Sequence, residues 1–157
     1  LILVYVSAIM FGMRFFAGAL AHRFSDTGLL CLTTIPAAIG LYLLSTANSP
    51  VTALVAATLW AIGVCFMWPT MLAAVARRYP KSGPWGIGLI GFAGALSIYF
   101  VLPRIGAIYD QAKAAVGGNE ATAAAQSFQT IAVLPVVLFF IFGAIWLLER
   151  ANGGARK

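Results

Sequence analysis

The chain contains 157 residues, of which 62% are hydrophobic and 9% are charged, whereas a typical soluble domain carries about 25% charged residues. This composition excludes a soluble all-α protein, because most of its helices would lack the polar face that such a protein turns toward water. The net charge of +6 does not indicate nucleic-acid binding, since the basic residues lie in short segments between apolar runs.

Five apolar runs follow one another along the chain, and each reaches the ~20 residues that a helix needs to cross a hydrocarbon core of about 30 Å. Because backbone groups inside a bilayer find no water to bind, runs of this length are predicted to be helices. We therefore expect an all-α fold, a polytopic membrane helix bundle that forms one half-domain over residues 1–157. The expected spans are 1–21, 28–47, 51–76, 85–108 and 129–148, and the tail is 149–157.

The first residue, Leu1, already lies inside an apolar run, and no basic segment precedes it. A signal peptide would begin with such a segment and end at a small-residue cleavage site. We therefore expect the chain to be a fragment that lacks N-terminal sequence, so that five is the minimum number of spans.

The segments between the runs differ in positive charge. Those after the first and third runs share one side of the membrane with the tail, and that side holds seven basic residues: Arg23, Arg77, Arg78, Lys81, Arg150, Arg156 and Lys157. The other side holds only Arg104 and Lys113. The positive-inside rule predicts a multi-pass protein of the cell membrane, plasma or inner, with a cytoplasmic C-terminus. The loop 103–129 is expected outside, as a flexible or partly helical excursion.

One charged side chain, Arg14, lies well inside a predicted span, about 10 Å from its cytoplasmic end at 1.5 Å per residue. An arginine at the centre of a membrane helix costs about 2.5–3.5 kcal/mol on insertion scales. Two interpretations remain open. The side chain extends to the interface or packs against a neighbouring helix end, or it faces a water-filled cavity.

Groups for catalysis or metal binding are missing from the predicted spans. None of the four acidic residues lies inside one, and an intramembrane proton relay needs a buried carboxylate or histidine. Cys31 and Cys65 lack the spacing of a metal site or of a disulfide framework. Gly86, Gly88 and Gly91 form a GxGxxG motif, but no strand precedes it, and it is expected to allow close helix packing. We expect no enzyme, no bound metal and no cofactor.

The third predicted span carries Pro69 directly after an aromatic group at 66–68. Membrane bundles tolerate such prolines as kinks, so this span suits either a substrate-lining gate or ordinary core packing. Isolated polar side chains lie in other spans, namely Tyr5, Ser7, Ser97 and Tyr99. Each can bond to a carbonyl one turn earlier, and together they are typical of the sparse polar lining of a site for a neutral or sugar-like solute.

A signature segment runs from Gly12 to Phe24. Its residues Gly12, Arg14, Gly18, Leu20, Ala21 and Arg23 match the pattern G-x-R-x-x-x-G-x-L-[AS]-D-R-x-G-R-R, and the segment thereby resembles the major facilitator superfamily. His22 replaces the usual Asp, and the residues at 25–27 replace the final Gly-Arg-Arg. This decay resembles the second, degenerate copy of the motif, which lies between helices eight and nine of the family.

Later segments agree with this resemblance. Residues 68–72 and 76–80 resemble the tenth helix and its basic exit, residues 91–110 the eleventh helix, and the last run with its tail the twelfth. The resemblance implies helices eight to twelve of a twelve-helix secondary active transporter, whose two halves rock around a midplane site. Its implied partners are a small-molecule solute, the lipid bilayer and the missing N-terminal half of the same transporter, and no nucleic acid.

The resemblance also implies two sets of functional residues. Helices eight, ten and eleven line the cavity in the family, which gives the substrate-lining candidates Tyr5, Trp60, Trp68, Ser97 and Tyr99. The signature clamps the cytoplasmic gate, which gives Gly12, Arg14, Gly18, His22 and Arg23. The expected function is a permease that moves a small organic solute by alternating access. The alternative is a structural or channel-forming integral membrane subunit without transport activity of its own.

Overall fold

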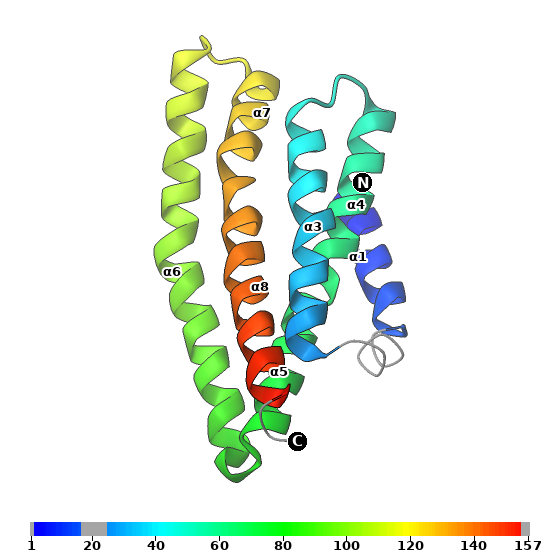
Figure 1. Cartoon of the computed structure of the whole chain (residues 1–157). Helices are drawn as coiled ribbons and strands as arrows, with labels where there is room; N and C mark the ends of the chain where they lie inside the picture. Colours follow the sequence, from blue (N-terminus) through cyan, green and yellow to red (C-terminus); the bar gives the residue numbers. More distant parts are fainter. Residues whose placement is uncertain (1, 17–24, 155–157) are drawn as a thin grey trace.

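The computed structural model describes residues 2–16 and 25–154, and over these residues the chain is helical, with no strand. The helices stand side by side as a bundle (Figure 1). In chain order they are α1 (Ile2–Arg14), α3 (Asp26–Ser45), α4 (Pro50–Cys65), α5 (Met67–Arg78), a 3₁₀ turn (Pro80–Ser82), α6 (Gly83–Ala115), α7 (Glu120–Ile131) and α8 (Val133–Gly154). The predicted all-α fold is confirmed.

Within the described residues, four helical stretches are long and apolar enough to cross a membrane. They are Asp26–Ser45, Pro50–Arg78, Pro80–Ala115 and Glu120–Ala151, and a shorter apolar helix covers Leu3–Arg14. The length and apolarity of these stretches make the chain a helical membrane protein. The last two stretches lie next to each other in the bundle and are joined by a short turn (Figure 1).

Capping side chains fix where the helices begin. The Ser25 hydroxyl accepts a hydrogen bond from the Gly28 amide at 3.2 Å, and Asp26 adds a favourable negative charge to the first turn of α3. At the start of α4, Ser49 and Thr52 form a reciprocal capping box. The polar residues of the loops therefore satisfy the free amides at the helix ends, outside the apolar body of the bundle.

Two of the membrane-spanning stretches are each divided into two helices. Pro69 has no amide hydrogen and cannot bond to the Cys65 carbonyl, which is where α4 ends. In the same way, Pro135 cannot bond to the Ile131 carbonyl, where α7 gives way to α8. The predicted span 51–76 thus lies in one helical stretch, Pro50–Arg78, whose hydrogen bonding is interrupted at Phe66 while the Phe66 backbone stays helical.

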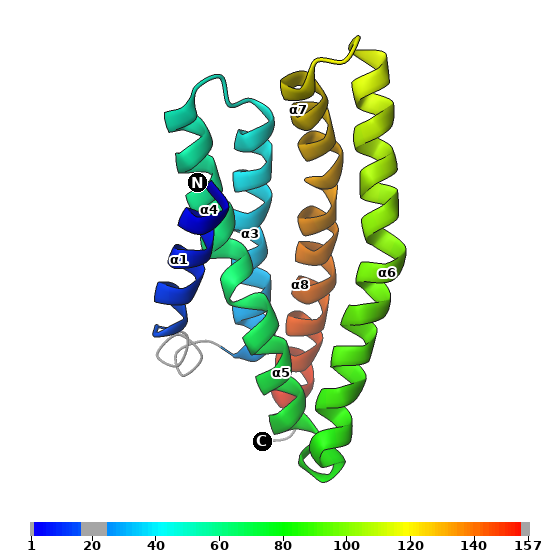
Figure 2. The same cartoon turned by 180° about the vertical axis from the view of Figure 1, so that it is seen from behind.

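Helix α3 lies at the centre of the bundle, in contact with α4, α5, α7 and α8, while α1 packs on α4 (Figure 2). A Cβ atom added to Gly63 would lie 2.7 Å from the Ala37 Cα, and one added to Gly40 would lie 2.6 Å from the Trp60 Cα. The backbones of α3 and α4 therefore touch at two glycines. Small residues allow this close approach, on which helix association in membranes depends.

Helix α6 lies at the edge of the bundle, where it contacts α5 and α7. Its 33 residues span about 50 Å at 1.5 Å per residue, and it extends beyond α3 at both ends (Figure 1). Only Gly86 of this helix is buried. The helix continues through Pro103 to Ala115, past the end of the predicted span at 108, and so covers the first part of the loop 103–129 that was expected to be flexible or partly helical. Arg104 lies inside a helix, because one proline removes a single backbone hydrogen bond and the residues after it favour helix.

Candidate functional site

Tyr5 on α1 and Thr58 on α4 form a polar contact within the apolar part of the bundle. The Tyr5 and Thr58 hydroxyl oxygens lie 2.9 Å apart, and the Thr58 hydroxyl donates to the Leu54 carbonyl at 2.8 Å. Because the Thr58 hydroxyl already donates its hydrogen to the Leu54 carbonyl, the Tyr5 hydroxyl is the donor in the contact between the two helices. Tyr5 is 41% exposed, so one side of its ring stays accessible from outside the α1–α4 pair.

Trp60 belongs to the packing between α1, α3 and α4. Its backbone meets Gly40 of α3, and its side chain packs against a core cluster of Val6, Ala57 and Ala61. These contacts give Trp60 a role in holding the three helices together. These contacts do not single out Trp60 as a residue that lines a substrate site.

Trp68 lies directly after the break in the α4–α5 pair, and it is 44% exposed. The edge of its ring lies over Gly94 of α6, where an added Cβ would be 3.0 Å from the Trp68 Cη2 atom. The missing side chain at Gly94 thus gives the indole the space that it occupies. The contact joins α5 to α6 beside the helix break.

Ser97 and Tyr99 lie farther along α6, and both are exposed. The Tyr99 ring meets the Phe100 ring edge-on, with 5.1 Å between the centroids. The substrate-lining candidates therefore do not gather in one pocket. Tyr5 and Trp60 belong to the α1–α4 pair, whereas Trp68 faces α6, which itself carries the other two.

Arg14 ends α1 and is exposed. A Cβ atom added to Gly12 meets nothing within 4 Å, so no neighbour in the described bundle requires a glycine there. The other predicted gate residues lie outside the described part of the chain: Gly18, His22 and Arg23.

A cluster of charged side chains joins three helices at the end of the bundle where α3 begins and α5 and α8 end. Arg77 donates to both carboxylate oxygens of Asp26, with Nε at 3.0 Å from Oδ2, the bidentate geometry that strengthens such a pair. Arg78 forms an ion pair with Glu149, which also accepts a hydrogen bond from the Thr27 hydroxyl at 2.6 Å. We refer to these five residues as the charged cluster.

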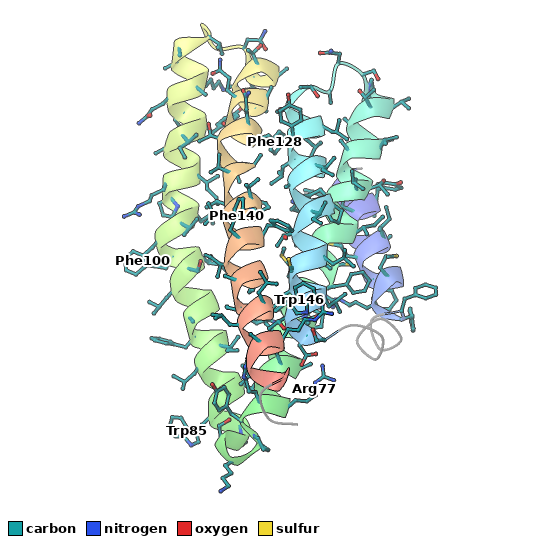
Figure 3. The ribbon with its side chains drawn as sticks, in the orientation of Figure 1. Arg77, Trp85, Phe100, Phe128, Phe140 and Trp146 are labelled. Atoms are coloured by element: carbon teal, nitrogen blue, oxygen red, sulfur yellow. The ribbon has the colours of Figure 1, made fainter. Side chains whose placement is uncertain are left out.

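The charged cluster surrounds an open hollow of about 400 Å³. Nearby, the Arg150 guanidinium lies over the Trp146 ring, 5.6 Å from its centroid, and Figure 3 shows Trp146 and Arg77 at this end of the bundle. The Arg77 side chain is 53% exposed and the Asp26 side chain 22%, so each single pair contributes about 0–1 kcal/mol. Together the pairs fix the relative positions of α3, α5 and α8.

The sequence predictions missed the charged cluster as a site. Its basic residues were used only to assign topology, although an acid in the first turn of α3 and another in the last turns of α8 were visible signals. A metal site is not formed there or elsewhere in residues 2–16 and 25–154, since no group of three or more His, Cys, Asp or Glu side chains comes together.

Comparisons with known proteins give the chain no relative. No protein-family model, no curated protein and no solved structure matches it significantly. The resemblance to the major facilitator superfamily therefore rests on the signature residues and the order of the spans.

Proposed function

We propose that the chain supplies helices eight to twelve of a secondary active transporter of the major facilitator type. The whole protein would then move a small organic solute across the membrane by alternating access, with the other half of the transporter as its partner. The signature residues Gly12, Arg14, Gly18 and Arg23 support the family. The proposed activity is transport, without an enzymatic step.

The observation that carries the proposal is the proline interruption between α4 and α5, in a stretch that packs on α6. The interruption leaves the Cys65 carbonyl without a partner from Pro69, and it lies next to the exposed ring of Trp68. A proline interruption of this kind frees a carbonyl inside an apolar helix and makes the helix easier to bend, which suits a helix that moves during alternating access.

The charge distribution supports an orientation in which the end of the bundle with the charged cluster faces the cytoplasm. Arg77, Arg78, Lys81 and Arg150 lie at that end of the bundle, whereas Lys113 lies near the turn between α6 and α7. Cytoplasmic segments carry the excess of Lys and Arg. We therefore propose a cytoplasmic C-terminus in the plasma or inner membrane.

Trp68→Ala tests the proposal in proteoliposomes that contain the full-length protein. We expect wild-type protein to show saturable uptake of at least one solute from a panel of labelled sugars, organic acids and nucleosides. The variant should lose at least about tenfold in kcat/KM, equivalent to about 1.4 kcal/mol. The reason is that it removes the indole ring, which fills the space between α5 and Gly94 of α6. Uptake is measured with and without a proton gradient.

Trp85→Ala is the matched control, because Trp85 is 82% exposed at the start of α6 and should leave uptake unchanged. Uptake that Trp68→Ala does not affect would exclude α5 from the solute path. If folded, correctly oriented protein takes up no solute under either gradient, transport itself is contradicted and the structural or channel-forming alternative is favoured.

A further inference from the structure

The charged cluster lies at the level where the membrane-spanning stretches end. One of these stretches begins at Asp26, a second ends at Arg78, and a third ends two residues after Glu149. Three helices therefore bring charged side chains to the boundary between the hydrocarbon core and the lipid headgroups. Trp146 lies at the same end of α8 (Figure 3), and tryptophan is enriched at this boundary.

The hollow in the charged cluster is bordered by all three of these helices. Its lining comes from the start of α3, from α5 and from α8, and its volume is about 400 Å³. Lys81 and Arg150 lie at the same end of the bundle, so the basic side chains around the hollow outnumber the two acidic ones. Basic pockets between the ends of membrane helices are places where anionic lipid headgroups bind.

The positive charges of the cluster are more exposed than its negative charges. The side chains of Arg77 and Arg78 are each 53% exposed. The carboxylates with which they pair are covered further, with 22% of the Asp26 side chain and 29% of the Glu149 side chain exposed. A group that enters the hollow from outside therefore meets guanidinium groups before it meets a carboxylate.

Both guanidiniums keep donors for a further acceptor. A guanidinium carries several N–H groups, of which Arg77 uses those on Nε and Nη2 for its carboxylate, and Arg78 meets its own through Nη1. The other N–H groups have no acceptor in the described part of the chain. Ser25 also lines the hollow, and because its oxygen accepts from a backbone amide, its hydroxyl hydrogen is available to donate. Such a set of donors suits a phosphate group.

An apolar surface continues from the hollow along the membrane-spanning part of α8. Ile145 lies about one turn before Glu149 on the same face, and Ile141 lies about one turn before Ile145. Both isoleucines are exposed, and so is Leu148 beside them. This surface can hold the acyl chains of a lipid whose headgroup lies in the hollow, whereas a free phosphate ion makes no use of it.

We propose that the charged cluster binds the phosphate of an anionic phospholipid, with Arg77 and Arg78 as the donors. The headgroup lies in the hollow, the acyl chains lie along α8, and the bound lipid holds the ends of α3, α5 and α8 together. The inference requires only that the chain lies in a membrane, so it is independent of the transport proposed above.

Binding is measured on the purified full-length protein in detergent, as the rise of the thermal unfolding midpoint with added short-chain phosphatidylglycerol. A ligand that binds only the folded state stabilises it increasingly as its concentration grows. We expect a saturable rise with phosphatidylglycerol, and no comparable rise with phosphatidylcholine of the same chain length or with inorganic phosphate. Each variant is compared with its own lipid-free midpoint, so that a change in its intrinsic stability does not count.

The test variant replaces a whole ion pair, Arg78→Gln together with Glu149→Gln, so that the net charge of the protein does not change. The half-saturating concentration of phosphatidylglycerol should rise at least about tenfold in this variant. Arg77→Gln together with Asp26→Asn makes the same replacement in the other pair, and it should weaken binding in the same direction. The two variants keep the test decisive even if one of them fails to fold.

Lys113→Gln together with Glu120→Gln is the matched control, because it removes the ion pair near the turn between α6 and α7 and should leave the lipid response unchanged. No rise with phosphatidylglycerol, a rise that both test variants keep, or an equal loss in the control overturns the site. An equal rise with phosphatidylcholine would assign the effect to acyl chains alone. An equal rise with inorganic phosphate would assign the hollow to a free ion, and either result overturns the lipid site.

Discussion

Gly63→Ala is expected to lower the thermal unfolding midpoint of the detergent-solubilised protein by about 2–12 °C. The new methyl group would lie 2.7 Å from both the Cα and the Cβ of Ala37, and Ala37 is fully buried. Because the obstacle includes the backbone of α3, no side-chain rotation relieves it, and the two helices must separate. Overpacking of this kind costs about 1–3 kcal/mol, and each kcal/mol shifts the midpoint by about 2–4 °C in a chain of this size.

Gly91→Ala provides the matched control for the packing of α3 on α4. Gly91 is also a glycine inside a membrane-spanning helix, but a Cβ added there meets nothing within 4 Å. Alanine favours the helix over glycine by about 1 kcal/mol, so this variant should unfold at the same temperature or slightly higher. Equal midpoints for the two variants would contradict the close crossing of α3 and α4.

Glu149→Arg is expected to destabilise the protein by about 2 kcal/mol. The change removes a charged hydrogen-bond acceptor and places a second positive charge beside Arg78. Glu149 accepts from the Thr27 hydroxyl at 2.6 Å and pairs with Arg78. Its side chain is 29% exposed, so solvent screens part of the interaction. Thermal unfolding in detergent at low and high salt measures the effect, which should be smaller at high salt.

The charge swap Glu149→Arg with Arg78→Glu should recover most of the lost stability, because it restores opposite charges at the same place. Recovery will be incomplete, since the hydrogen bond from Thr27 is not restored. Glu120→Arg is the control: the Glu120 side chain is 73% exposed, so solvent screens its pair with Lys113 and this variant should unfold close to the wild-type temperature. If the swap is no more stable than Glu149→Arg alone, the pairing of α5 with α8 is contradicted.

The length of the apolar runs predicts the helices well, because the membrane allows no other structure for such runs. The run 28–47 corresponds closely to α3, whose bounds are Asp26–Ser45. The effect of each proline is harder to predict, since it depends on the neighbouring helices. The helical hydrogen bonding is interrupted before Pro69, whereas α6 continues through Pro103.

Pairs between distant residues were beyond prediction, because the rotation of each helix about its own axis is not encoded in a local pattern. Asp26 and Arg77 were both visible as charges at span ends, but only the packing of α5 on α3 brings them together. Tyr5 was chosen for its polarity in a span, and its partner Thr58 depends equally on the α1–α4 packing.

The central proposal is that the chain forms part of a solute path, and Ser97 on α6 is one of its substrate-lining candidates. The most direct test is the reaction of Ser97→Cys, in a protein whose Cys31 and Cys65 are replaced by alanine, with a membrane-impermeant maleimide. Val137→Cys is the control, since Val137 is 47% exposed on the apolar surface of α8. The account predicts that the cysteine at 97 reacts and the one at 137 does not. Reaction of the cysteine at 97 only with a membrane-permeant maleimide would show that lipid covers this face and would contradict the account.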